Sequence, residues 1–185
     1  MMNINLRNDF YIVRHGKAKN NMLGIESCKM ETQILYGLIP EGKKAVEEEA
    51  KRYTEFDLIF SSPFRRTQET AAYFEKTSRC EIFLDNRLVD IDLGDFDQSS
   101  YEASNEHLKK HPENDYVFPN GESILQVLER LIDFLKDINT RYSGKKILIV
   151  SHGFPCETLL DWVSNKPLSN WDSCIEKGKV FPLRP

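Results

Sequence analysis

The sequence predicts an α/β fold, a three-layer α/β/α sandwich with a mainly parallel central sheet, and three observations support this class. Short apolar runs typical of strands occur at residues 10–13, 57–60, 81–84 and 146–151. Helical patterns lie between them, and strands that alternate with helices favour a parallel sheet between helical layers. The second and fourth runs lack the alternation of a half-exposed strand, so we expect them to be buried on both faces.

The first two helices are predicted from proline and serine at their starts. Pro40 suits the first turn of a helix over the charged stretch 40–56. Ser62 and Pro63 are expected to cap and open a second helix that continues to about Phe74. Each helix then connects two strands, as a parallel sheet requires.

Apolar spacing predicts the longest helix, over residues 122–140. Its apolar residues recur every three or four positions and are expected to face the core. They are Leu125, Leu128, Ile132, Leu135 and Ile138. Gly144 marks a stop beyond this helix, and a further helix is expected after Pro155.

Two polar stretches, 22–39 and 98–120, are expected to be long surface loops. Long loops in a compact domain are often functional. The second stretch includes EHLKKHPEND, where a short helix is expected, and we predict that 98–120 forms a short lid over the site. His107 and His111, both in this stretch, are expected to face solvent.

Length and composition are ordinary for a globular protein. With 185 residues, of which 40% are hydrophobic and 29% charged, the chain has room for one domain, predicted over residues 1–185. A net charge of -4 disfavours nucleic acid or an anionic membrane as a partner. The sequence leaves the oligomeric state open.

The cysteines and the N-terminal stretch indicate a cytoplasmic location. The cysteines form no CxxC pair and fit neither a disulfide framework nor a zinc site; they are Cys28, Cys80, Cys156 and Cys174. No apolar run approaches the roughly 20 residues of a membrane span, and the polar start lacks the apolar region of a signal peptide. No metal-ligand motif or nucleotide-binding glycine loop occurs, so neither a metal nor a cofactor is expected.

Two histidines follow two apolar strands in the same way. YIVRHG places Arg14, His15 and Gly16 at one strand end, and ILIVSHG places His152 and Gly153 at another. A single histidine there is more often an ordinary hydrogen-bonded residue, and Arg14 with His15 alone could be a solvated strand exit. Ligands bind at the carboxyl ends of parallel strands, so neighbouring strands would bring both histidines to one pocket. Glycine after each histidine permits close approach of the backbone.

Arg65 and Arg66 are predicted near the start of the second helix. Backbone N–H groups there already favour an anion, although both arginines could equally be solvated surface charges. A neutral imidazole is a competent nucleophile toward phosphorus, and guanidinium groups match the oxygens of a transferring phosphoryl group. With the two histidines, these residues indicate phosphoryl transfer through a phosphohistidine.

Six motifs occur in order along nearly the whole chain: YIVRHG, LIPEGKKA, IFSSPFRRTQETA, RLVDIDLGDF, PNGES and ILIVSHG. Together they resemble the histidine phosphatase superfamily, the phosphoglycerate mutase-like phosphatases of branch 1. The resemblance implies that His15 is the nucleophile that becomes phosphorylated, that Arg14 binds the phosphate, and that His152 stabilises the transferring group. Arg66, not Arg65, matches the second arginine of the family.

Three more residues, Asn21, Lys17 and Gly153, are expected to contact the substrate. Asn21 matches an asparagine that often contacts phosphate or substrate in the family, and Asn20 is the lesser candidate. Where many members have Glu or Gln and then Thr, this chain has Lys17 and Ala18, so Lys17 is expected to bear on substrate preference. Gly153, after the second histidine, is also expected to border the substrate.

The general acid is expected to be Asp90, which stands where the family usually has glutamate. An alkoxide leaving group must be protonated, and a neighbouring phosphate raises the pKa of a carboxyl group. Asp92 ranks second, Asp95 lies close by, and any of the three could be a turn residue. PNGES is expected to be a turn and the start of a helix.

The expected function is a metal-independent phosphatase, a histidine acid phosphatase-like phosphomonoesterase that acts on a small phosphorylated molecule. A phosphoglycerate-type mutase is the first alternative, although 98–120 is short compared with the insertion that usually closes a mutase pocket. A phospho-ligand binding module with weak catalysis is the second, because Asp90 replaces the usual glutamate. The sequence does not identify the substrate.

Overall fold

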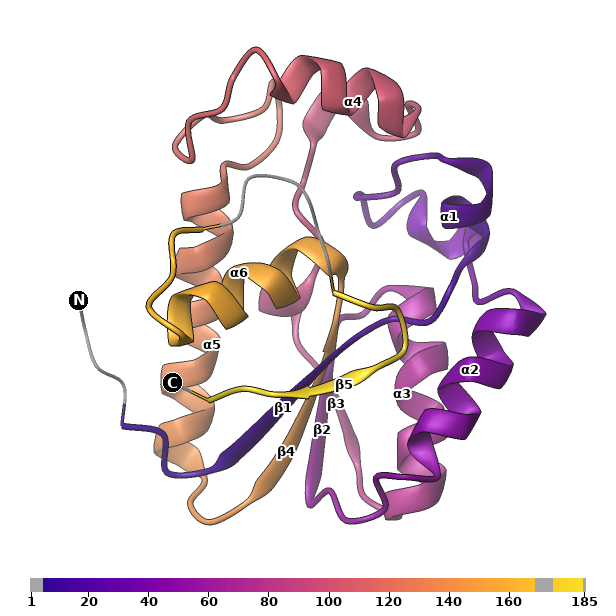
Figure 1. Ribbon diagram of the computed structural model, residues 1–185, viewed down its shortest axis with the longest axis vertical. Coiled ribbons are helices and arrows are strands. Elements are labelled where there is room, and N and C mark those ends of the chain that lie inside the picture. Colours follow the sequence, from indigo (N-terminus) through magenta and orange to yellow (C-terminus); the bar gives the residue numbers. More distant parts are fainter. Residues whose placement is uncertain (1–4, 169–174, 185) are drawn as a thin grey trace.

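The computed structural model describes residues 5–168 and 175–184, which form a five-stranded sheet between helices (Figure 1). The strand order is β3-β2-β4-β1-β5, and the pairs are parallel except β1 with β5. The strands are β1 (Asp9–Arg14), β2 (Leu58–Ser61), β3 (Ile82–Leu84), β4 (Lys146–Ser151) and β5 (Val180–Pro182). The predicted strands and the mainly parallel sheet are confirmed.

Helices cover both faces of this sheet, as the three-layer prediction required. α2 and α3 lie on one face, and α5 and α6 lie on the other (Figure 1). Their bounds are Pro40–Ala50, Arg65–Ser78, Ile124–Arg141 and Gly153–Val163. Successive residues of a strand point to opposite faces, so Ile12 packs with α5 and α6 while Val13 packs with α2 and α3.

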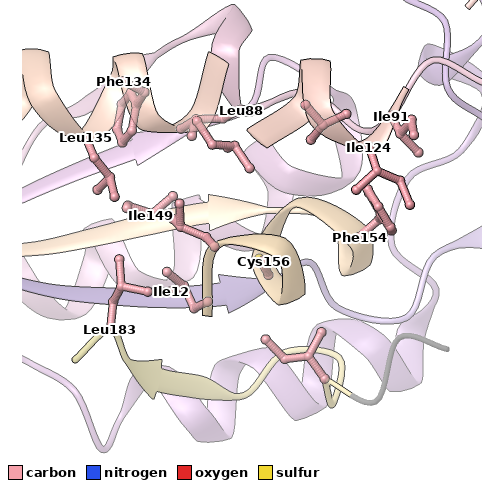
Figure 2. Close-up of a cluster of buried hydrophobic side chains, with 14 of the residues drawn as sticks. Ile12, Leu88, Ile91, Ile124, Phe134, Leu135, Ile149, Phe154, Cys156 and Leu183 are labelled. Atoms are coloured by element: carbon pink, nitrogen blue, oxygen red, sulfur yellow. The ribbon is translucent and has the colours of Figure 1, made fainter. Parts of the chain in front are cut away.

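The larger hydrophobic cluster fills the space between the sheet and α5 with α6. Figure 2 shows Ile12 and Ile149 of the sheet near Leu135 of α5 and Cys156 of α6. Each of these side chains is at most 2% exposed, so their burial is a main source of stability. The central strands are thereby fixed, and the residues that follow them are held in place.

Two short helices lie at the end of the molecule where the parallel strands terminate (Figure 1). α1 (Lys19–Leu23) follows β1, and α4 (Tyr101–Leu108) lies in the second polar stretch. Short 3-10 helices span Gln33–Leu35, Asn86–Leu88 and Gly94–Phe96. The short helix expected within 98–120 is present, although it begins five residues before EHLKKHPEND.

Helix boundaries differ from the sequence expectations in several places, and the helix expected after Pro155 already begins at Gly153. α2 ends at Ala50 rather than near residue 56, because Phe56 turns back and packs edge-on against Tyr11 of β1. α3 begins at Arg65 and continues to Ser78, and its N-cap is Phe64 without a side-chain bond. Ser62 is therefore not the cap of this helix.

The buried face of α5 agrees only in part with the predicted one: Leu135 and Ile138 are fully buried as expected, whereas Leu128 and Ile132 are half-buried. Leu125 is 40% exposed, whereas Ile124, Val127 and Leu131 are at most 1% exposed. Apolar residues occur on two overlapping stripes, and contact with the sheet, which the sequence does not display, selects one of them. The helix begins after Ser123, whose side chain accepts from the Gln126 N–H as an N-cap.

The remaining expectations concern two histidines, a cysteine and membrane spans, and one strand was not expected at all. His107 and His111 are only partly exposed, because both pack with Tyr116 in an aromatic cluster. β5 was not predicted, because three residues ending in proline carry no periodic pattern. Cys174 lies outside the described residues. No helix in the described part of the chain has the length and apolar character to cross a membrane.

Candidate active site

The site forms where β1 and β4 end side by side. The strands pair in parallel, with Arg14 opposite Ser151. The ladder continues one residue further, since the His15 N–H donates to the Ser151 carbonyl at 2.9 Å. The next residue of the second strand is His152, and the centroids of the two imidazole rings are 5.3 Å apart. Backbone pairing therefore brings together the two histidines that the sequence places at separate strand ends.

His15 is 2% exposed and its orientation is fixed by the backbone. Its Nδ1 lies 2.8 Å from the Gly16 carbonyl oxygen. A carbonyl can only accept, so Nδ1 carries the proton and Nε2 has a free electron pair. Gly16 is required here, because an added Cβ would lie 2.6 Å from Val46 Cγ2.

Arg66 connects the polar side chains at the centre of the site. It is 1% exposed, and its Nε lies 3.1 Å from His15 Nε2. Its Nη2 lies 2.9 Å from His152 Nδ1 and 3.1 Å from Asp90 Oδ2. We call these four residues, His15, Arg66, Asp90 and His152, the histidine cluster. Arg66 also donates to the Ser27 carbonyl at 3.0 Å.

His152 is fully buried and is held from both sides of its ring. Nδ1 accepts from Arg66, so Nε2 carries the proton and donates to Ser62 Oγ at 2.9 Å. Ser62, expected as a helix cap, instead orients this histidine. Its Oγ also accepts from the Phe64 N–H at 3.3 Å.

Asp90 reaches the cluster from the segment after β3. Arg130 of α5 donates to the Arg87 and Asp90 carbonyls at 2.6 and 3.1 Å, which fixes the backbone on which Asp90 stands. Glu122 pairs with Arg130 at 3.0 Å and accepts from the Asp92 N–H. The PNGES motif is thus a turn that holds the Asp90 segment, and α5 starts two residues after its glutamate.

Burial and charge shift the pKa of each ionisable group in the cluster. Burial, with the positive charges of Arg66 and Arg14, lowers the pKa of His15 well below its usual range. Burial and Arg66 do the same to the pKa of His152. Burial raises the pKa of Asp90, although Arg66 and Arg14 oppose this shift. Both imidazoles are therefore neutral at pH 7, and the Asp90 carboxyl is closer to protonation than an exposed aspartate.

A pocket of about 600 Å³ opens over this cluster. His15 and Asp90 line it, whereas Arg66 and His152 lie directly behind them. Arg14, Gly153 and Lys177 add to the lining. Such a pocket presents positive charge and a neutral imidazole nitrogen to an entering anion.

Of the other predicted substrate contacts, Asn21 and Asn20 line the pocket and Lys17 does not. Asn21 lines the pocket, but its Oδ1 accepts from the Ala18 N–H and its Nδ2 donates to the Tyr101 hydroxyl at 2.9 Å. Lys17 is exposed and is not part of the pocket lining. Asn20, the lesser candidate, lines the pocket and is 4% exposed.

The alternatives to Asp90 and Arg66 lie outside the pocket. Asp92 accepts from the Gly94 N–H at 2.8 Å, and Asp95 accepts from the Asn120 side chain. Both are thus turn residues. Arg65 pairs with Glu69 at 2.8 Å and donates to the Ile34 carbonyl, so it supports the neighbouring loop.

Sequence reasoning missed several residues of the pocket lining, namely Glu26, Ser27, Tyr101, Asn105 and Lys177. One signal was present: Tyr101, Ser104, Asn105 and Leu108 recur at helical spacing inside the polar stretch. No pattern marks Glu26 or Lys177. Among the described residues, no three His, Cys, Asp or Glu side chains gather as a metal site would require.

A parallel sheet with two histidines at adjacent strand ends defines the class of protein. The relatives agree: the chain is 30% identical over 183 residues to a protein named uncharacterized phosphatase PhoE from Bacillus subtilis, covering 91% of this chain and 90% of that one. It is 27% identical to a probable phosphoglycerate mutase GpmB from Escherichia fergusonii, covering 85% and 75%. The class is that of phosphatase or mutase-like enzymes.

The family model of the histidine phosphatase superfamily (branch 1) matches residues 10–179, and the chain belongs to this superfamily. The solved structure of YhfR from Bacillus stearothermophilus superposes with a TM-score of 0.79 at 24% identity and covers 94% of this chain and 89% of that one. The structural likeness confirms the phosphoglycerate mutase-like fold.

Proposed function

We propose that the protein is a metal-independent phosphatase that hydrolyses a small phosphate monoester through a phosphohistidine on His15. One observation carries the proposal: His15 Nδ1 is tied to the Gly16 carbonyl, so the electron pair of Nε2 points to Arg66 Nε at 3.1 Å. Because burial and neighbouring cations lower the pKa of His15, the imidazole is neutral and nucleophilic at pH 7.

The proposed reaction has two displacements at phosphorus. The substrate phosphate binds on the pocket side of His15 and displaces the hydrogen bond from Arg66 Nε to His15 Nε2, so that the guanidinium donates to the phosphate oxygens instead. The Nε2 electron pair forms a bond to phosphorus while the bond to the ester oxygen breaks. Water then attacks the phosphohistidine, which releases inorganic phosphate and restores neutral His15. Arg14 and Arg66 stabilise the charge on the oxygens that do not react.

Asp90 is the proposed proton donor and acceptor. Its Oδ2 lies 3.1 Å from Arg66 Nη2 and 3.4 Å from His152 Nδ1, at the border of the pocket. Burial raises its pKa, and a bound phosphate dianion raises it further, so the carboxyl is protonated when the ester binds. It gives this proton to the leaving oxygen and later takes one from the attacking water.

We further propose that 98–120 acts as a short lid within a single domain. Tyr101, Asn105 and Leu108 of α4 line the pocket, which supports this role. α4 has only eight residues, so water retains access, and hydrolysis is favoured over transfer to a second substrate. A cytoplasmic enzyme without nucleic acid or membrane partners fits the net charge of -4 and the free thiols of Cys28, Cys80 and Cys156.

Hydrolysis of p-nitrophenyl phosphate in the presence of EDTA tests the proposal. We expect wild type to be active and His15→Ala to lose at least about 10³-fold in kcat, because no nucleophile remains. His111→Ala, a histidine outside the pocket, is the matched control and should keep its activity. Equal rates for wild type and His15→Ala, or full loss of activity in EDTA, would overturn the mechanism.

The relative named as a probable phosphoglycerate mutase makes transfer the second candidate. A mutase would interconvert 2- and 3-phosphoglycerate, with turnover that rises when the bisphosphorylated compound is added. Release of inorganic phosphate without that addition supports the phosphatase. Tight binding of phosphate esters with negligible turnover would instead favour a binding module.

A further inference from the structure

One wall of the pocket consists of polar side chains that the proposed reaction does not use. Asn20 comes from α1, Glu26 from the loop that follows it, and Tyr101 and Asn105 from α4. We call these four residues the polar wall. They line the same pocket as His15 and Asp90. If the phosphate binds at His15, these side chains are available to contact the alcohol part of the substrate.

Glu26 is a carboxyl group without a cationic partner. Its Oε1 accepts from Ser104 Oγ at 2.6 Å, and within the described residues it forms no ion pair. Burial raises its pKa to about 7; the Ser104 hydrogen bond and Arg66 oppose this shift, and Asp90 and Asp97 add to it. Ionised Glu26 thus costs free energy in the empty pocket, and a cation bound beside it would recover that cost.

Asn20 provides a second acceptor that lacks a donor. Its Nδ2 donates to the Ile25 carbonyl at 3.2 Å and approaches the Tyr101 hydroxyl at 3.3 Å. The carbonyl of Ile25 fixes the orientation of the amide, because the reversed amide would set two oxygens against each other. Asn20 Oδ1 is buried and has no hydrogen-bond partner among the described residues. A buried acceptor without a donor is uncommon and needs an explanation.

We propose that the polar wall binds an ammonium group on the leaving alcohol, so that the substrates are phosphate monoesters of small amino alcohols. The inference rests on the proposed phosphatase function and narrows its substrate class. An ammonium group has three N–H donors, which match the acceptors Glu26 and Asn20, and the Tyr101 ring adds an aromatic surface that favours cations. On binding, Glu26 gives up its proton to solvent and forms the ion pair.

The distribution of charge around the pocket agrees with such a substrate. Lys177 lines the pocket, and its pKa is lowered by burial and by the positive charges of Arg14 and Lys17 nearby. Glu26 lies near Asp90 and Asp97, and Arg66 is the cation close enough to oppose the rise of its pKa. Arg14 and Lys177 thus give the pocket positive charge that suits the phosphate dianion, and Glu26 gives it a carboxyl group that suits a cation. A neutral or anionic alcohol would leave Glu26 without a partner.

Binding of two phosphonates to wild type provides the first test. 3-Aminopropylphosphonate and butylphosphonate have the same length and differ only in an ammonium group in place of a methyl group. We expect calorimetry at pH 7.5 to give at least about tenfold tighter binding of the aminophosphonate. The preference should increase from pH 6 to pH 8, because ionised Glu26 becomes the major form above its pKa of about 7. Equal affinities for the two compounds would overturn the inference.

Glu26→Gln assigns the preference to this carboxyl. Glutamine keeps an oxygen for Ser104 but has no charge, so the preference should fall to within about threefold. Glu102→Gln, on the exposed side of α4, is the matched control and should keep it. At pH 6, wild type should release more protons with the aminophosphonate than with butylphosphonate, and Glu26→Gln should not. A preference that survives Glu26→Gln contradicts the proposal.

Hydrolysis of phosphoethanolamine and propyl phosphate separates this inference from the proposed function. We expect a ratio of kcat/KM of at least about ten in wild type and near unity in Glu26→Gln. If the protein hydrolyses p-nitrophenyl phosphate but does not prefer phosphoethanolamine to propyl phosphate, the phosphatase proposal stands and the substrate class is rejected. If it binds the aminophosphonate more tightly but hydrolyses no ester, the phosphatase proposal is rejected and the ammonium site stands. If Glu26→Gln lowers kcat/KM equally for both esters and keeps the wild-type preference, Glu26 acts as a proton donor, and the ammonium-binding proposal is rejected.

Discussion

The histidine cluster and the polar wall meet in one pocket but are held in different ways. His15 and His152 follow adjacent strands, and a backbone hydrogen bond of 2.9 Å from His15 to Ser151 sets their spacing. Glu26 and Tyr101 stand on a loop and a short helix, and side-chain hydrogen bonds to Ser104 and Asn21 hold them. The spacing of the two histidines thus depends on the sheet, whereas the polar wall depends on individual side chains.

The difference teaches how one fold can keep its chemistry while its substrate changes. Residues fixed by a buried parallel sheet cannot move without disturbing the core, whereas loop residues can be exchanged at small cost. Arg66 joins the two regions, because it contacts His15 and also donates to the Ser27 carbonyl in the loop next to Glu26. Substitutions in the two regions should therefore change different kinetic constants.

After loss of the nucleophile itself, the largest effect is expected when the link between the two regions is cut. Arg66→Lys should lower kcat/KM for p-nitrophenyl phosphate by about 10²- to 10³-fold, because a single ammonium cannot replace the planar donors that reach His15, His152 and Asp90 together. Steady-state kinetics with a thermal melt of the variant measures this. Arg65→Lys, at the exposed neighbouring position, should change the rate less than twofold. Similar losses in both variants would contradict the assignment.

An intermediate effect is expected at Asp90 and should depend on the leaving group. Asp90→Asn cannot donate a proton, so kcat for an alkyl phosphate should fall about 10- to 100-fold. The nitrophenolate of p-nitrophenyl phosphate needs no protonation, and its kcat should fall less than about threefold. Asp95→Asn, on the same segment but outside the pocket, is the control. Equal losses on both substrates would remove Asp90 from the acid role.

The smallest effect is expected in the polar wall. Tyr101→Phe removes the hydroxyl that accepts from Asn21 at 2.9 Å, so KM should rise a few-fold with little change in kcat. The loss of one hydrogen bond should also lower the free energy of unfolding by about 1 kcal/mol. Tyr116→Phe removes the hydroxyl bonded to His107, also in 98–120, and should affect stability without affecting KM. If Tyr101→Phe and Tyr116→Phe raise KM equally, segment 98–120 affects substrate binding only through its folding stability and not through a contact of Tyr101.

Much of the fold and the core of the cluster could be predicted, because local patterns carry them. The apolar runs before His15 and His152 predict parallel strands, and the rule that ligands bind at their carboxyl ends predicts that the histidines meet. Arg66 was separated from Arg65 by the spacing of a family motif. Lys17 shows the limit of this method: it departs from the motif, yet it is exposed and outside the pocket lining.

The sequence by itself determined the layers, the strand ends and the residues placed on them, since periodicity and turn residues act over a few positions. Only the tertiary structure decided that Ser62 orients His152, which lies 90 positions further on, and that α4 brings Tyr101 to Asn21 across 80 positions. It also decided which stripe of α5 is buried and that Glu26 borders the pocket. Contacts between distant side chains depend on how the layers pack, and no local pattern records that packing.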